Sequence, residues 1–168
     1  MSLDLIHGTG VARTDPILDV GGGASQLVDH LMALGHTDVS VLDIAPAALE
    51  KARARLGPAA KQVEWIAADV TTFQPLRRYT VWHDRGVFHF LVTPSDRMSY
   101  LKALVAALAP QGHLVLATFG PQGPLRCSGL PVQRYSEDDI GALLGSQFQL
   151  RSSEIENHLT PSGQEQQL

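Results

Sequence analysis

The sequence contains a single cysteine, Cys127. One thiol excludes an internal disulfide bond and a zinc site built from cysteines. No apolar run is long enough to span a bilayer. The segment Met1–Gly8 also lacks the basic start and apolar core of a secretory signal. These absences predict a cytoplasmic protein that does not insert into a membrane.

An excess of positive charge is missing as well. The formal net charge is −4 at pH 7, so electrostatics gives no reason to expect binding to nucleic acid or to an anionic membrane. The chain has 168 residues, of which 44% are hydrophobic. This length and composition predict one globular domain over residues 1–168, with its core at residues 15–156. We expect its partner to be a small molecule.

Short apolar runs alternate with segments of helical period, while Met1–Thr14 has no clear period and is expected to be irregular. The runs predict strands at Ile17–Val20, Val39–Leu42, Val63–Ala67, Tyr79–His83, His113–Phe119 and Phe148–Ile155, with a turn at Pro110–Gly112. Helices are expected at about 25–34, 45–56, 93–108 and 136–144. This alternation predicts an α/β fold with a mainly parallel, doubly wound, Rossmann-like sheet. Ligands of such sheets bind beyond the carboxyl ends of the strands.

Three consecutive glycines, Gly21, Gly22 and Gly23, follow the first predicted strand and precede a helix. Glycine lacks a Cβ atom, so the backbone here can approach a ligand closely. The first N–H groups of the helix point into the same gap. A strand, a glycine turn and a helix in this order are typical of a nucleotide-type cofactor site.

Aspartates end the next two predicted strands. Asp43 follows Gly23 by twenty residues, and a carboxylate there can accept hydrogen bonds from two ribose hydroxyls. Asp69 can accept a hydrogen bond from an adenine amino group while Val70 donates its backbone N–H. The alternative for each aspartate is a structural role as a helix cap or loop anchor.

The type of cofactor follows from the residues that flank the glycines. A dinucleotide fingerprint needs a small residue where Gln26 stands. Asp19 would lie beneath a pyrophosphate, where its negative charge is unfavourable, whereas an ammonium and a sulfonium centre favour it. The chain also lacks a Tyr-x-x-x-Lys pair. A NAD-dependent oxidoreductase is therefore the less favoured alternative.

Four segments together resemble class I S-adenosylmethionine (SAM) dependent methyltransferases. Ile17–Gly23 resembles the first motif of this superfamily, and Asp43 matches its ribose-binding acid. Residues 67–70, Ala-Ala-Asp-Val, match its adenine-contacting segment. Leu108–Leu116 is similar to its L-x-P-G-G turn, with Gln111 in place of the usual glycine. The resemblance implies a SAM-dependent methyltransferase with the superfamily's fold, a sheet whose last strand is antiparallel.

The resemblance also implies which residues hold SAM. Asp19 would stand near its amino group, the glycines under its methionine part, Asp43 at the ribose and Ile44 over the adenine. The backbone of His83 would also accept a hydrogen bond from the amino group. The complete predicted set is Asp19, Gly21, Gly22, Gly23, Ser25, Asp43, Ile44, Asp69, Val70 and His83, in which Ser25 replaces a third glycine and can cap the helix.

No catalytic signature is visible for the methyl acceptor. His83 and Asp84 are candidates for orienting or deprotonating it, and the alternative is that Asp84 pairs with Arg85 or another neighbour and fixes the loop. His89 is expected to be a hydrogen-bonded core residue. No metal site is proposed, because the two histidines lack a suitable spacing and no carboxylate cluster joins them.

The chain resembles a bacterial small-molecule methyltransferase that is shortened at both ends. About sixteen residues precede Ile17, so the helices that normally cap the cofactor are expected to be missing. No apolar run follows Ile155, so the last strand is expected to be missing too. The sheet would then have an exposed edge, for which we predict a homodimer. The alternative is a non-catalytic or partner-dependent SAM-binding protein.

Overall fold

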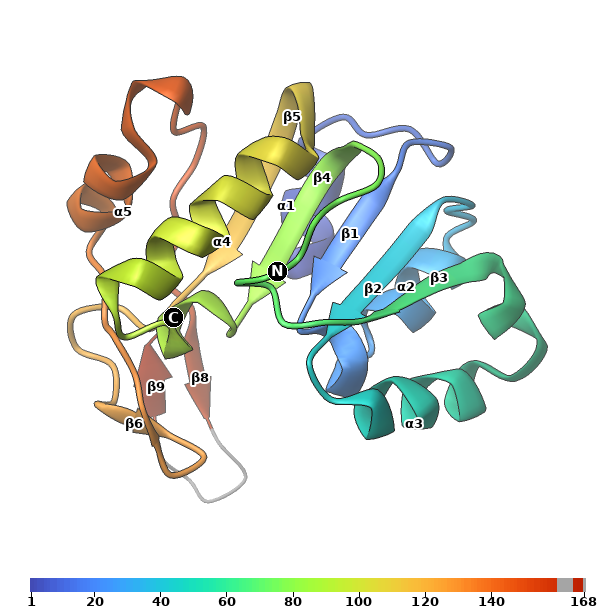
Figure 1. Ribbon diagram of the computed structural model, residues 1–168, viewed down its shortest axis with the longest axis horizontal. Coiled ribbons are helices and arrows are strands. Elements are labelled where there is room, and N and C mark those ends of the chain that lie inside the picture. Colours follow the sequence, from blue (N-terminus) through green and yellow to red (C-terminus); the bar gives the residue numbers. More distant parts are fainter. Residues whose placement is uncertain (160–164, 168) are drawn as a thin grey trace. The chain divides into compact units, whose positions relative to one another are not determined.

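The computed structural model describes residues 1–159 and 165–167. Its main feature is a five-stranded sheet with the order β3-β2-β1-β4-β5 (Figure 1). The strands are β1 (Ile17–Val20), β2 (Val39–Asp43), β3 (Val63–Ala67), β4 (Tyr79–Arg85) and β5 (Leu108–Ala117). β1 pairs in parallel with β2 and β4, and β2 pairs in parallel with β3. The predicted Rossmann-like, mainly parallel sheet is thereby confirmed.

Helices cover both faces of this sheet, with α4 on one face and α1 and α2 on the other (Figure 1). The helices are α1 (Ser2–Gly8), α2 (Leu27–Ala33), α3 (Pro46–Leu56), α4 (Pro94–Ala107) and α5 (Glu137–Leu144). Short 3-10 segments are η1 (Gly22–Ala24), η2 (Gly57–Gln62), η3 (Phe88–Phe90) and η4 (Gly145–Gln147). Ile6 of α1, Leu31 of α2 and Leu49 of α3 pack in one buried cluster with Val41 and Val81 of the sheet. This cluster holds the strands in place beneath the glycine turn.

The chain forms two compact units. Unit 1 comprises residues 1–85 and 98–116 and contains the sheet, and unit 2 comprises residues 86–97 and 117–168. Unit 2 contains α5 and two short antiparallel ribbons, β6 (Arg126–Cys127) with β7 (Leu130–Pro131) and β8 (Asn157–Leu159) with β9 (Glu165–Gln167). The single domain over residues 1–168 stays a prediction.

Side chains cap the starts of two helices, α4 and α5. The Thr93 hydroxyl accepts a hydrogen bond from the Asp96 N–H at 3.1 Å. The Ser136 hydroxyl accepts one from the Asp139 N–H at 3.1 Å, and the Asp139 carboxylate accepts one from the Ser136 N–H at 2.8 Å. Short polar side chains satisfy N–H groups that a helix start leaves unpaired, which is why such local signals are informative.

Two local expectations near the chain's first and fifth strands are wrong. Residues 2–8 of the expected irregular lead-in form α1, and its Ile6 is fully buried. One buried residue in two turns is too weak a signal for a period to be seen. The expected turn at Pro110–Gly112 lies within β5, where Gln111 takes a left-handed φ of 63°.

The expected strand over Phe148–Ile155 is also absent from the described structure. The segment follows η4 without forming a ladder, and Leu150 and Ile155 are exposed. Four polar residues between these two positions interrupt the alternation that a half-buried strand needs. In the described residues, β5 is therefore an edge of the sheet.

Residues 157–168, which follow the point where the last strand of the sheet was expected to be missing, contain the short strands β8 and β9. Residues 160–164 and 168 lie outside the described residues. Within residues 1–159 and 165–167, no helix combines the length and the hydrophobicity needed to cross a membrane.

Candidate functional site

The glycine turn begins where β1 ends. Gly21 has a left-handed φ of 74°, and its N–H donates to the Leu42 carbonyl of β2 at 2.7 Å. A side chain at this φ would be strained, so the turn requires a glycine here. The Ser25 hydroxyl accepts a hydrogen bond from the Leu27 N–H at 3.0 Å. The N-cap residue of α2 is Gln26, whose side chain makes no capping hydrogen bond, so Ser25 contacts the first residue of the helix from the position before the cap.

The other two glycines allow two carboxylates to contact the turn. A Cβ atom at Gly22 would lie 2.2 Å from Oδ2 of Asp19, and one at Gly23 would lie 2.8 Å from Oδ2 of Asp43. Both distances are far below van der Waals contact, so any side chain here would displace a carboxylate. The structure thus brings Asp19, Asp43 and the glycines together in one cluster.

Asp43, the last residue of β2, is tied to the backbone on both sides. Its Oδ2 accepts a hydrogen bond from the Gly23 N–H at 3.0 Å, and its Oδ1 accepts one from the Ala45 N–H at 2.8 Å. Each carboxylate oxygen has a second lone pair, so these bonds leave acceptor capacity for a ligand. The next residue, Ile44, is 69% exposed. The structural and the ligand-binding interpretations of Asp43 are therefore compatible.

Asp69 acts as a loop anchor after β3. Its Oδ1 accepts hydrogen bonds from the Thr71 N–H at 2.8 Å and from the Thr71 hydroxyl at 2.7 Å. Val70 is buried. These contacts fix the conformation of the loop around Asp69, which is predicted to contact the adenine edge.

Asp19 forms a buried pair with His83 on the neighbouring strand. The β1–β4 register places the two residues opposite each other, and His83 Nδ1 lies 2.7 Å from Asp19 Oδ1. His83 is 3% exposed and Asp19 is 2% exposed. A carboxylate that is ionised only accepts hydrogen bonds, so this contact pairs it with the His83 tautomer that carries a proton on Nδ1. Within the part of the chain that the structure describes, the buried Oδ2 of Asp19 has no hydrogen-bond partner.

Sequence reasoning missed this pairing, although it placed both residues near the cofactor. Asp19 and His83 are 64 residues apart, and their contact depends on the register of two strands. A usable signal was present, because each residue follows a buried apolar residue two positions earlier, Ile17 and Val81. Alternation in strands then places all four side chains on one face.

Asp84 points to the opposite face, toward α4. It is fully buried, and its Oδ2 accepts a hydrogen bond from the Tyr100 hydroxyl at 2.8 Å. That hydroxyl in turn accepts a hydrogen bond from Trp82 Nε1 at 2.9 Å. Burial, together with the neighbouring carboxylate, raises the pKa of Tyr100 well above its usual value, so the phenol keeps its proton and donates it. This network favours the structural alternative for Asp84.

His89 in unit 2 is a core residue, but it is not hydrogen-bonded through its ring as expected. It is 3% exposed, and its ring centroid lies 4.5 Å from those of Phe90 and Phe119. Neither ring nitrogen has a hydrogen-bond partner among the described residues. Burial lowers the pKa of His89 to about 4, so the imidazole is neutral at pH 7.

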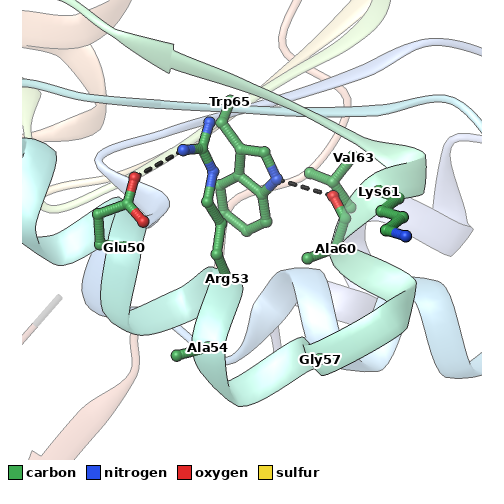
Figure 2. Close-up of a pocket in the computed structure, with 8 residues that line it drawn as sticks. All are labelled: Glu50, Arg53, Ala54, Gly57, Ala60, Lys61, Val63 and Trp65. Carbon is green, nitrogen blue, oxygen red and sulfur yellow. Dashed lines mark hydrogen bonds and ion pairs between the residues drawn. The ribbon is translucent and has the colours of Figure 1, made fainter.

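A hollow of about 580 Å³ lies between α3 and β3, away from the predicted site residues (Figure 2). Figure 2 shows the Arg53 guanidinium against the Trp65 ring, with Glu50 as its ion-pair partner at 2.6 Å. Trp65 Nε1 donates to the Ala60 carbonyl at 2.9 Å. Because these polar groups satisfy one another and none of the predicted cofactor residues lines the hollow, the glycine turn remains the candidate site.

Residues 17–112, more than half of the chain, match the profile of a family described as "Methyltransferase domain". The chain is also similar to two curated proteins over part of their length. It is 32% identical over 109 residues to malonyl-[acyl-carrier protein] O-methyltransferase of Anoxybacillus flavithermus. The aligned segment covers 62% of this chain and 39% of the relative. It is 30% identical over 113 residues to N-terminal Xaa-Pro-Lys N-methyltransferase 1 of Danio rerio. This aligned segment covers 66% of this chain and 50% of the relative. The chain thus spans half the length of these relatives or less.

Solved structures share the fold. SAM-bound CalS10, an amino pentose methyltransferase from Micromonospora echinaspora, superimposes with a TM-score of 0.60 and 28% identity, over 72% of this chain and 51% of that one. The Burkholderia thailandensis 1,6-didemethyltoxoflavin-N1-methyltransferase, solved with 1,6-didemethyltoxoflavin and S-adenosylhomocysteine, gives a TM-score of 0.73 at 22% identity. That alignment covers 99% of this chain and 72% of that one.

Proposed function

This chain belongs to the methyltransferase domain family, and on that premise we propose that it binds SAM and transfers the methyl group to a small-molecule acceptor. One observation carries the proposal. The buried carboxylate of Asp19 faces the glycine turn with one oxygen unpartnered in the described residues. A buried acceptor of this kind is costly unless a donor or cation meets it, and the amino group of SAM is both.

The other predicted cofactor residues, at the ends of β2 and β3 and in the glycine turn, fit the rest of SAM. Asp43 keeps lone pairs for the ribose hydroxyls, and Ile44 exposes an apolar side chain for the adenine face. We propose that Asp69 and the Val70 backbone N–H contact the edge of the adenine, as the sequence predicts. Gly21, Gly22 and Gly23 let the backbone lie against the methionine part, and the Ser25 hydroxyl accepts a hydrogen bond from the Leu27 N–H at the start of α2. The backbone carbonyl of His83 is proposed as a further acceptor for the amino group.

SAM supplies a methyl group already activated by its sulfonium centre. The protein's contribution is to hold cofactor and acceptor in line, and a base is required only for an acceptor that must lose a proton. His83 and Asp84 are 3% and 0% exposed, and each is hydrogen-bonded to another buried side chain. Because burial keeps both side chains from an acceptor, we propose neither as the base and assign catalysis to positioning.

The small-molecule acceptor is proposed from two solved structures that share the fold, an amino pentose methyltransferase and a 1,6-didemethyltoxoflavin-N1-methyltransferase. A net charge of −4 supports a small molecule over a nucleic acid. We further propose a cytoplasmic location and a homodimer that covers the edge strand β5. Sedimentation at micromolar protein concentration tests the oligomeric state. A dimer mass supports the proposal, and a monomer mass contradicts it.

Calorimetry with S-adenosylhomocysteine tests the cofactor. We expect binding of S-adenosylhomocysteine and none of NADH, and the reverse result overturns the proposal in favour of an oxidoreductase. Transfer of a labelled methyl group from SAM to an added acceptor then separates an enzyme from a protein that only binds SAM.

The variant Asp43→Ala tests the assignment of the ribose. Loss of a carboxylate that accepts two hydroxyl hydrogen bonds should weaken S-adenosylhomocysteine roughly 10- to 100-fold. The Gly23 and Ala45 N–H groups also lose their acceptor, which should cost about 1 kcal/mol of stability. Asp38→Ala is the matched control, since Asp38 precedes the same strand at its other end and pairs with Arg77. Unchanged affinity in Asp43→Ala removes the ribose assignment.

A further inference from the structure

The pair formed by Asp19 and His83 occupies positions where the sheet otherwise buries apolar side chains. Ile17 precedes Asp19 by two residues on β1, and Val81 precedes His83 by two on β4, and both belong to the hydrophobic core. Nonpolar residues at these two positions would extend the core without any polar group to satisfy. The pair is therefore not explained by stability.

The geometry shows what distinguishes the two oxygens of Asp19. Oδ1 is bound by His83 Nδ1 at 2.7 Å. Oδ2 points at the glycine turn, where a Cβ on Gly22 would come within 2.2 Å of it. In the described chain, Oδ2 is the oxygen with no hydrogen-bond partner. A single bond to Oδ1 thus fixes the plane of the carboxylate and leaves the other oxygen directed at the proposed cofactor.

We propose that the side chain of His83 is a positioning residue, which holds the Asp19 carboxylate so that Oδ2 receives the ammonium group of the cofactor's amino-acid portion. This inference rests on the proposed function and adds a residue whose side chain acts through Asp19. A carboxylate already held in its binding orientation loses less conformational freedom when the ligand arrives. The contact concerns the amino-acid portion alone, because Asp43 and Ile44 are assigned to the ribose and adenine.

Two ligands separate this role from a general effect on the fold. S-Adenosylhomocysteine carries the amino-acid portion, whereas 5′-methylthioadenosine shares its adenine, ribose and thioether but lacks the ammonium group. In His83→Leu, the affinity for S-adenosylhomocysteine should fall about tenfold or more, the loss expected for one weakened charge-assisted hydrogen bond. The affinity for 5′-methylthioadenosine should stay within about twofold of the wild type.

A conservative variant and a matched control complete the calorimetry. His83→Asn offers a side-chain N–H to Oδ1 and should restore most of the affinity lost in His83→Leu. His36→Leu replaces another buried histidine that lies outside the proposed site, and it should leave both affinities unchanged. Nitrogen NMR of the wild type without ligand should show the proton of the His83 ring on Nδ1.

The outcomes are distinct. An equal loss of affinity for both ligands in His83→Leu, or no rescue by His83→Asn, overturns the positioning role and leaves His83 as part of the fold. Unchanged affinity for S-adenosylhomocysteine in His83→Leu overturns it as well. If the wild-type protein binds neither ligand, the proposed function itself fails, while the NMR result still reports on the pair.

Discussion

Asp19 and Asp84 lie at the same end of two neighbouring strands, and both are almost fully buried, yet their surroundings differ. Asp84 is held by the Tyr100 hydroxyl, which is itself held by Trp82. Asp19 is held by His83 on one oxygen, and its other oxygen has no partner in residues 1–159 and 165–167. A buried carboxylate whose oxygen is bonded within a network of core residues, such as Asp84, stabilises the fold, whereas the half-satisfied carboxylate of Asp19 keeps an oxygen for a ligand.

Asp84→Ala should give the largest loss of stability, about 3 kcal/mol in the free energy of unfolding. The Tyr100 hydroxyl would keep its donor, Trp82, and lose its acceptor, and an unsatisfied buried hydroxyl costs roughly 1–3 kcal/mol before the cavity is counted. Urea unfolding at pH 7 measures this. Tyr100→Phe, which removes the same hydrogen bond from the other side, serves as the matched variant. A loss below about 1 kcal/mol in Asp84→Ala would break the comparison.

His89 extends the comparison to unit 2, because it is buried with both ring nitrogens unpartnered in the described residues. Burial lowers its pKa from 6.5 to about 4. The unfolded chain therefore binds a proton below about pH 6.5, and the folded chain binds it only near pH 4. Stability falls as the pH falls through this range, by about 2 kcal/mol at pH 5 for this group.

The measurement is urea unfolding of the wild type and of His89→Phe at pH 7 and pH 5. Phenylalanine keeps an aromatic ring beside Phe90 and Phe119 and cannot be protonated. The difference in stability between the two proteins isolates His89 from the other histidines. His36, whose pKa is also lowered by burial, contributes equally to both. Parallel loss of stability in the two proteins would show that His89 has a donor or a solvent path.

The fold was predictable from the sequence where local patterns carry the information. The strands Ile17–Val20 and Val63–Ala67 are short apolar runs, and Ser136 with Asp139 is a cap whose hydrogen bonds lie within four residues. Asp43 was placed at its strand end by the apolar run Val39–Leu42 before it and by its distance from Gly23. The resemblance to class I methyltransferases then ordered these pieces, and the family match over residues 17–112 agrees with it.

The remaining features depend on contacts between distant parts of the chain. The bond from His83 to Asp19 requires the β1–β4 register, and the hydrogen bond from Tyr100 to Asp84 requires the placement of α4 on the sheet. Gln111 has a positive φ, a backbone conformation that usually favours glycine, so the residue type alone does not reveal this conformation. The strand predicted at Phe148–Ile155 is absent from the described residues, because a local pattern does not show whether a neighbouring strand is there to pair with.

Gly22→Ala changes the glycine turn that Asp19 Oδ2 faces. The added Cβ would lie 2.2 Å from Asp19 Oδ2 and 2.9 Å from Val41 Cγ1. We expect a stability loss of about 1.5 kcal/mol, because the carboxylate must move against its bond to His83. Binding of S-adenosylhomocysteine should weaken at least tenfold, since the displaced Oδ2 no longer faces the turn.

Gly141→Ala is the matched control for this substitution. Gly141 lies inside α5, and an added Cβ there meets nothing within 4 Å. Alanine should therefore raise stability by about 0.5–1 kcal/mol, because glycine in a helix is unfavourable relative to alanine. Equal behaviour of the two variants in urea unfolding would mean that Gly22 has room for a side chain.

Asp19→Asn should have the smallest effect on stability, less than about 0.5 kcal/mol. Asparagine has the same shape and keeps an oxygen that accepts the hydrogen bond from His83. This bond becomes weaker without the charge, but the variant also avoids burying a charged oxygen that has no partner in the described chain, and the two changes offset each other. The amide N–H groups would then face the cofactor's ammonium, so affinity for S-adenosylhomocysteine should fall at least tenfold. A stability loss as large as that of Asp84→Ala would place both carboxylates in the fold and remove the distinction between them.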